Sequence, residues 1–206
     1  MKHVHTIVAG GGLALALATA LGTHISPAEA DAKIASNRQL RGQYSGITTG
    51  GCLISLDGFD ENNRPTDQTR TYSNLFNAEA VFTFDGYGRG TADFPTVTNI
   101  IVPGPNAPPV AQPGVSLSTG GGNFTYSVGP KNTVTVTLTD PVFKTLPALQ
   151  SSTVIDRVVL EGHFGPNGVT LVKSDGAIEI LTPSAGSPFP RICERSVILL
   201  SDQSRF

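Results

Sequence analysis

Two cysteines are the first residues of this chain whose types and spacing could do chemistry. Cys52 and Cys193 lie far apart in the sequence, and no other cysteine is present. In an oxidising compartment a lone pair of cysteines is expected to form a disulfide, and closing so long a loop would stabilise the fold by about 5 kcal/mol in the chain-entropy model. We therefore predict a Cys52–Cys193 disulfide, with buried free thiols or a metal pair as the alternatives.

A histidine and a glutamate form the next candidate pair. His163 is the single histidine after residue 30, and Glu161 precedes it by two positions. On a strand the two side chains share one face, so they could act as an acid–base pair if that face pointed inward. A solvated polar row is the alternative interpretation. Since no Gly-x-Ser-x-Gly motif is present either, we assign no catalytic residue and expect a protein that is not an enzyme.

Metal and cofactor sites are not predicted. Oxygen donors gather from Asp57 to Asp67, but their spacing differs from that of a calcium loop. One histidine and an oxidised cysteine pair leave too few ligands for zinc. The glycines at 120–122 lack the lysine and the helix of a phosphate-binding loop.

The elements that must position these residues are strands. Apolar and polar residues alternate within 40–46, 78–94, 124–139, 154–164 and 191–200, which is the period of two of half-buried strands. Residues 57–74 are mostly polar and predict a loop. Prolines crowd 95–121, and because proline cannot donate to a strand ladder, this segment is also predicted as a loop, either a lid over an opening or a surface segment.

The first thirty residues predict export. Lys2 precedes a short apolar run, and Ala28-Glu29-Ala30 ends the segment with small residues, which is the order of a secretory signal. The apolar run is shorter than the roughly 20 residues that a spanning helix needs. We expect residues 1–30 to be removed, 31–39 to be a lead-in, and 40–206 to form one secreted or periplasmic domain.

Neither nucleic acid nor a membrane is an expected partner. The formal net charge is −2, so the chain offers no basic field for nucleic acid. Phe206 is an aromatic C-terminus of the kind found in outer-membrane barrels, but Asp202 and Ser204 stand at alternate positions where apolar residues are expected. We therefore expect no membrane insertion, and the sequence predicts no oligomeric state.

These elements together predict an all-β fold. About eight antiparallel strands joined by hairpins, without crossover helices, can remove their exposed edges by closing into an up-and-down barrel. A two-sheet β-sandwich is the alternative. Closure would place the first strand beside the last, where Cys52 and Cys193 would meet.

The start of the first strand carries a family resemblance. Gly42-Gln43-Tyr44 resembles the Gly-x-Trp of lipocalin-like (calycin) eight-stranded barrels, in which an arginine of the last strand covers the aromatic ring. Tyr44 stands in place of the tryptophan, Arg195 lies on the terminal strand, and no second lipocalin motif follows. The chain is also similar in strand count to allene-oxide-cyclase-like barrels. The resemblance implies a cup that holds a small apolar ligand.

The sequence therefore predicts a binding module for a small apolar ligand. The candidate ligand-binding side chains are Tyr44, Phe82, Phe84, Phe124, Tyr126 and Val136. The same side chains could instead fill the interior of a small barrel. The other hypotheses are a structural or surface-interaction protein acting through 57–74 and 95–121, an enzyme using Glu161 and His163, and an outer-membrane barrel.

Overall fold

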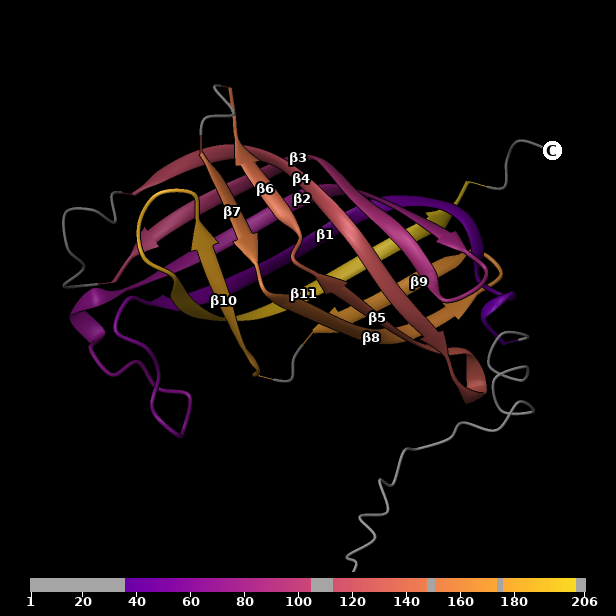
Figure 1. The fold of residues 1–206 in the computed structure, drawn as a ribbon, viewed down its shortest axis with the longest axis horizontal. Helices are drawn as coiled ribbons and strands as arrows, with labels where there is room; N and C mark the ends of the chain where they lie inside the picture. The colour runs from indigo at the N-terminus through magenta and orange to yellow at the C-terminus, as the bar shows by residue number, and fades with distance from the viewer. Residues whose placement is uncertain (1–35, 105–112, 148–150, 174–175, 203–206) are drawn as a thin grey trace, which may run out of the picture.

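The computed structural model describes residues 36–104, 113–147, 151–173 and 176–202 (Figure 1). Within these ranges eleven antiparallel strands form one sheet, and the short 3₁₀ turns Gln68–Arg70 and Pro130–Asn132 precede β2 and β5. The strands are β1 (Arg41–Ser55), β2 (Thr71–Asp85), β3 (Arg89–Pro103), β4 (Gly114–Val128), β5 (Thr133–Thr139), β6 (Val142–Thr145), β7 (Ser152–Ile155), β8 (Arg157–Gly165), β9 (Gly168–Lys173), β10 (Ile178–Pro183) and β11 (Phe189–Ser201).

The sheet closes on itself. Eight strands follow one another in the order β1-β2-β3-β4-β5-β8-β9-β11, and the pairing of β1 with β11 completes the ring. The register of this seam runs from Tyr44 opposite Ser201 to Ile54 opposite Arg191. Closure gives both edge strands a partner, which removes exposed edges. The predicted all-β class and antiparallel barrel are therefore confirmed.

The wall has two tiers on one side. The long strands β1 to β4 and β11 run the length of the barrel, whereas β5, β8 and β9 line one end and β6, β7 and β10 the other (Figure 1). Asp156 lies between β7 and β8 and links this interruption of the wall to β10 through two hydrogen bonds. Its backbone nitrogen donates to the Ile180 carbonyl at 3.1 Å, and its Oδ1 accepts from the Ile180 nitrogen at 3.0 Å.

The predicted disulfide latches the seam. Cys52 of β1 lies directly opposite Cys193 of β11, the two sulfurs are bonded, and the Cα atoms are 4.1 Å apart. Both residues are buried. The disulfide thus links the first and last strands of the ring across a sequence separation of 141 residues.

The prediction of a loop over 95–121 is wrong. Most of that segment belongs to β3 and β4, which pair with each other from Arg89–Thr125 to Ile101–Gly114. Pro95 sits at a shift of the register between Phe94 and Val97, and Pro103 is the last residue of β3. These are the positions in a sheet where a missing N–H is tolerated. Residues 105–112 lie outside the described residues, so the lid stays a prediction.

Two other segments also differ from what the sequence pattern indicates. The predicted loop 57–74 ends early, because β2 begins at Thr71. The segment 141–152, which shows no alternation in the sequence, contributes β6 and the start of β7. The strand pattern predicted over 78–94 is confirmed: it forms a hairpin that extends further in both directions, as β2 and β3.

One end of the barrel is filled by aromatic side chains. The Phe84 ring lies 5.4 Å from that of Tyr44 and 5.0 Å from those of Phe124 and Tyr126, measured between centroids. The residues just before β1 close this end, because the Tyr126 hydroxyl donates to the Leu40 carbonyl at 2.8 Å and Leu40 is fully buried. The interior is therefore solid here.

Glycines on the inner wall make room for aromatic rings at both ends of the barrel. Gly90 faces Phe124 across β3 and β4, and a Cβ at Gly90 would lie 2.3 Å from that ring. Gly50 faces Phe76 across β1 and β2, and a Cβ there would lie 2.6 Å from the ring. A glycine opposite a phenylalanine thus lets a large ring lie flat along a narrow interior.

Candidate functional site

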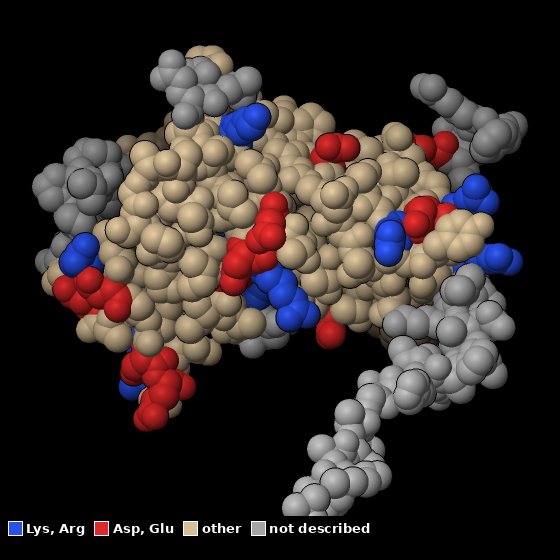
Figure 2. Space-filling model, viewed as in Figure 1, with Lys and Arg blue, Asp and Glu red and all other residues tan. Residues whose placement is uncertain are grey.

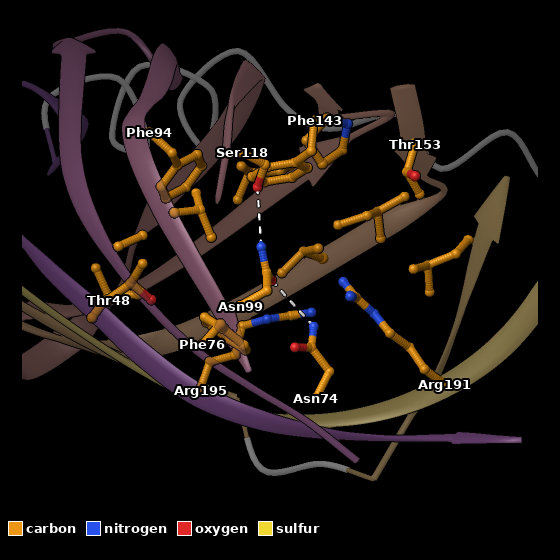
Figure 3. A pocket seen from close by; sticks show the side chains of 18 of the residues that line it. Thr48, Asn74, Phe76, Phe94, Asn99, Ser118, Phe143, Thr153, Arg191 and Arg195 are labelled. Atoms are coloured by element: carbon orange, nitrogen blue, oxygen red, sulfur yellow. Dashed lines mark hydrogen bonds between the residues drawn. The ribbon is translucent and has the colours of Figure 1, made fainter. Parts of the chain in front are cut away.

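The other end of the barrel is hollow. A cavity of about 220 Å³ is lined by residues of β1 to β8, β10 and β11 (Figure 3). Its apolar lining includes Phe82, Phe94 and Leu138. Strands β2 and β4, which carry aromatic residues at the filled end, carry Asn74 and Ser118 here, and Asn99 of β3 lies between them. These shorter polar side chains leave space that the rings fill elsewhere.

A chain of amides crosses the wall of the cavity. The Asn74 side-chain nitrogen donates to Asn99 Oδ1 at 3.2 Å, and the Asn99 side-chain nitrogen donates to Ser118 Oγ at 3.1 Å (Figure 3). The Asn74 Oδ1 atom is buried and, within the described part of the chain, accepts no hydrogen bond. A buried acceptor without a donor costs about 1–3 kcal/mol, so this oxygen could accept a hydrogen bond from a molecule in the cavity.

A buried group of charged side chains lies next to the cavity. Glu179 of β10 sits opposite Arg191 of β11 and accepts from its Nε at 2.9 Å. Both terminal nitrogens of Arg195 also donate to the Glu179 carboxylate, and Lys173 Nζ lies 4.0 Å from it. The four side chains are at most 8% exposed. We refer to Lys173, Glu179, Arg191 and Arg195 as the charged cluster.

Burial and mutual charge set the protonation of this cluster. Burial alone would raise the pKa of Glu179, but the hydrogen bonds and positive charges of Arg195 and Arg191 outweigh it and hold the pKa below its ordinary value. Burial, with the nearby charge of Arg195, lowers the pKa of Arg191 to about 10. At neutral pH the carboxylate and the Arg191 guanidinium are therefore both ionised.

Only part of the charged cluster faces the cavity. Arg191 and Arg195 are among the lining residues, whereas Glu179 and Lys173 are not. The guanidinium of Arg191 points toward the space between the labelled side chains of Figure 3. Arg195 lies over the Phe76 ring, with its guanidinium carbon 5.9 Å from the ring centroid. The lining of the cavity therefore combines apolar side chains, the hydrogen-bonded chain from Asn74 to Ser118 and two guanidinium groups.

The sequence-predicted ligand-binding residues divide between the two ends. All six are buried, but among them only Phe82 lines the cavity. The other five, which are Tyr44, Phe84, Phe124, Tyr126 and Val136, belong to the packed apolar core.

The arginine–aromatic contact implied by the resemblance to lipocalins is placed differently. Arg195 covers Phe76, while the Tyr44 ring packs on Phe84. The seam register explains the difference, because Arg195 faces Gly50 and Tyr44 faces Ser201.

The remaining candidates lie on the outside of the barrel. Glu161 and His163 are exposed on β8, and neither is among the cavity-lining residues. In the loop that follows β1, Asp57 pairs with Arg70 at 2.7 Å, and Asp60 Oδ1 accepts from the backbone nitrogens of Asn62 and Arg64. The Asp57 and Asp60 carboxylates therefore stabilise the conformation of this loop.

The described residues hold no cluster of potential metal ligands and no helix that could cross a membrane. No group of three or more His, Cys, Asp or Glu side chains in that part of the chain could hold a metal ion. Among the same residues, no helix is long and apolar enough to cross a membrane.

Comparisons with known proteins do not extend this description. No protein-family model matches the chain, and neither a curated protein nor a solved structure does so. Figure 2 shows that charged side chains are sparse on the face in view and form small groups of mixed sign. The fold and the site therefore define the class of the protein: an all-β antiparallel barrel with an internal cavity of mixed polarity.

Proposed function

We propose that this protein binds a small molecule inside the barrel, at the end lined by Asn74 and Arg191. The observation that carries the proposal is the cavity of about 220 Å³, which lies beside a packed apolar core. Pockets for drug-sized ligands span roughly 300–1,000 Å³ and combine apolar walls with a few polar groups. This cavity has the same character and is somewhat smaller, so its ligand is expected to be smaller than a typical drug.

Because the cavity has polar lining residues, the proposed ligand differs from the small apolar molecule that the sequence predicts. A purely apolar molecule would leave Asn74 Oδ1 without a donor and both arginines without a new partner. The proposal is therefore a ligand with an apolar body, which contacts Phe82 and Leu138, and with at least one polar group.

The place of action is part of the proposal. We infer export through the signal at residues 1–30, supported by the Cys52–Cys193 disulfide, a bond that persists in oxidising compartments. Polar side chains such as Glu161 and His163 are exposed on the outer wall beside apolar ones such as Ile47 and Ile198, and we infer a barrel that is not inserted in a membrane. Extraction from cells only with detergent would contradict this part of the proposal.

A pair of substitutions on one strand tests the binding function. Ala78 of β2 is buried and lines the cavity, so Ala78→Leu would fill part of it. Asn77, its neighbour, is exposed on the outer face, so Asn77→Leu adds the same side chain without entering the cavity.

The readout is native mass spectrometry together with a thermal-shift screen of small molecules on the full chain. We expect ligands that bind the wild type and the Asn77→Leu variant and that are lost from the folded Ala78→Leu variant. If no compound distinguishes Ala78→Leu from the wild type, the cavity is not a binding site. The barrel would then act through its outer surface.

A further inference from the structure

The charges that line the cavity are all of one sign. Among its described lining residues, Arg191 and Arg195 are charged, and none is Asp or Glu. Glu179 lies behind the two arginines and is 1% exposed. One carboxylate therefore faces two guanidinium groups, which leaves an excess of positive charge beside the cavity, whatever the contribution of Lys173.

The two arginines differ in how far their donors are used. Arg195 has both terminal nitrogens on Glu179 and its guanidinium over Phe76. Arg191 gives only its Nε to Glu179, and within the described residues its two terminal nitrogens donate no hydrogen bond. A planar guanidinium with both terminal nitrogens available matches the two oxygens of a carboxylate.

The surroundings of Arg191 contain one further acidic group. Asp156 lies close enough to raise the pKa of Arg191. Its Oδ1, however, accepts from the backbone nitrogens of Ile180 and Arg157, and Asp156 is exposed and does not line the cavity. It therefore does not occupy the donors that Arg191 turns toward the cavity.

We infer that the ligand of this cavity is a small organic carboxylate, held by the terminal nitrogens of Arg191, with its apolar body among Phe82, Phe94 and Leu138. This inference rests on the proposed binding function. The ligand's size follows from the cavity, since about 150 Å³ holds a benzene molecule and about 220 Å³ then holds roughly nine non-hydrogen atoms. A single-ring aromatic acid has that size.

A hydroxyl group on the ligand would complete the set of partners. Asn74 Oδ1 lines the cavity from β2 and needs a donor, which a carboxylate cannot supply. A hydroxyl can donate to this oxygen. The class of ligand that satisfies Arg191, the apolar side chains and Asn74 together is therefore a compact hydroxy acid.

The test compares two probes that share the phenol ring and differ in the group that would bind Arg191. 4-Hydroxybenzoate has the carboxylate, and 4-hydroxybenzyl alcohol has the same ring without it. Because a hydrogen bond to a charged group adds about 1.5–3 kcal/mol, calorimetry on the full chain should give roughly tenfold to hundredfold tighter binding of the acid.

Two arginine variants locate the effect. Arg191→Met should bring the two affinities to within about threefold of each other, while Arg157→Gln, an exposed change on the outer face of β8, should leave the preference intact. If Arg191→Met does not fold, Arg191→Lys keeps the charge and loses the planar fork, and should weaken acid binding while leaving alcohol binding unchanged.

The outcomes separate the two levels of the proposal. Equal binding of acid and alcohol by the wild type would overturn the carboxylate inference and leave the binding function standing. Displacement of the acid by inorganic phosphate at equal concentration would show a plain anion site and would also overturn it. Failure of the wild type to bind any member of a panel of acids and matched alcohols of about six to twelve non-hydrogen atoms would contradict the binding function itself.

Discussion

Glu179→Gln is the substitution that most directly tests the electrostatic account of the charged cluster. The carboxylate is 1% exposed and accepts from Arg191 at 2.9 Å and from both terminal nitrogens of Arg195. Glutamine keeps the shape and one acceptor oxygen but removes the charge. Removing one partner of a buried ion pair costs about 3–5 kcal/mol, because the other partner stays buried without compensation.

That loss would be large compared with the stability of an ordinary domain. Folded domains are stable by about 5–15 kcal/mol, so Glu179→Gln is expected to remove a substantial share of the free energy of unfolding. The assay is urea unfolding followed by circular dichroism, with the disulfide intact. Urea is uncharged and does not screen the cluster. If the slope of the unfolding free energy against urea concentration is the same in both proteins, the folded and unfolded states are equally compact in both.

Asp57→Asn is the matched control. It makes the same carboxylate-to-amide change in an ion pair of 2.7 Å with Arg70, but the Asp57 side chain is 35% exposed. An exposed pair of this kind contributes about 0–1 kcal/mol. Equal, small losses for the two variants would refute the reasoning, because they would mean that the cluster is hydrated or that its cations lose their protons at little cost.

Three further predictions follow from the same geometry. The pKa of Glu179 is lowered in the fold, so its contribution to stability is complete above its unfolded value of about 4.3 and is lost as pH falls through the folded value; the difference in urea midpoint between wild type and Glu179→Gln should therefore shrink from pH 7 to pH 3, and a constant difference would contradict the assignment. The Cys52→Ala/Cys193→Ala variant should lose up to about 5 kcal/mol by the chain-entropy model, since the closed loop spans 141 residues, and unfolding that matches the oxidised protein would show that the seam is held by its strand pairing alone. Phe84→Ala should cost about 3–5 kcal/mol in unfolding experiments, since its ring packs on those of Tyr44, Phe124 and Tyr126, yet leave the affinity for a cavity ligand unchanged; a loss of affinity with the fold intact would place the ligand at the other end.

The sequence predicts the strands best where one face is apolar along its whole length. The alternation in 124–139 becomes β4 and β5 with Phe124, Tyr126, Val134 and Val136 all buried. The cysteine pair also predicts the seam correctly, because closing the ring brings the first and last strands together.

The prediction fails where prolines interrupt an extended chain. Proline removes a donor but does not prevent a strand at a register shift or at a strand end, and Pro95 and Pro103 occupy those two positions. Composition alone cannot distinguish such a strand from a loop, because the distinction depends on which N–H groups face a partner.

Lys173, Glu179 and Arg191 are missed for a related reason, whereas Arg195 is named from its place on the last strand. Ile178 and Ile180 flank Glu179, so ordinary alternation predicts that the isoleucines face the core and the glutamate faces solvent. The structure shows the reverse, since Ile178 is 43% exposed and Glu179 is 1% exposed. One signal was available in the last strand. If Cys193 faces inward to form the disulfide, Arg191 and Arg195, two positions away on either side, must face inward too.

The most direct test of the central claim is a crystal structure of the full chain with 4-hydroxybenzoate. The account predicts electron density for the ring inside the barrel, among Phe82, Phe94 and Leu138, with the carboxylate within hydrogen-bond distance of the terminal nitrogens of Arg191. An interior filled by protein side chains at this end, or density for the acid only on the outer wall, would contradict it.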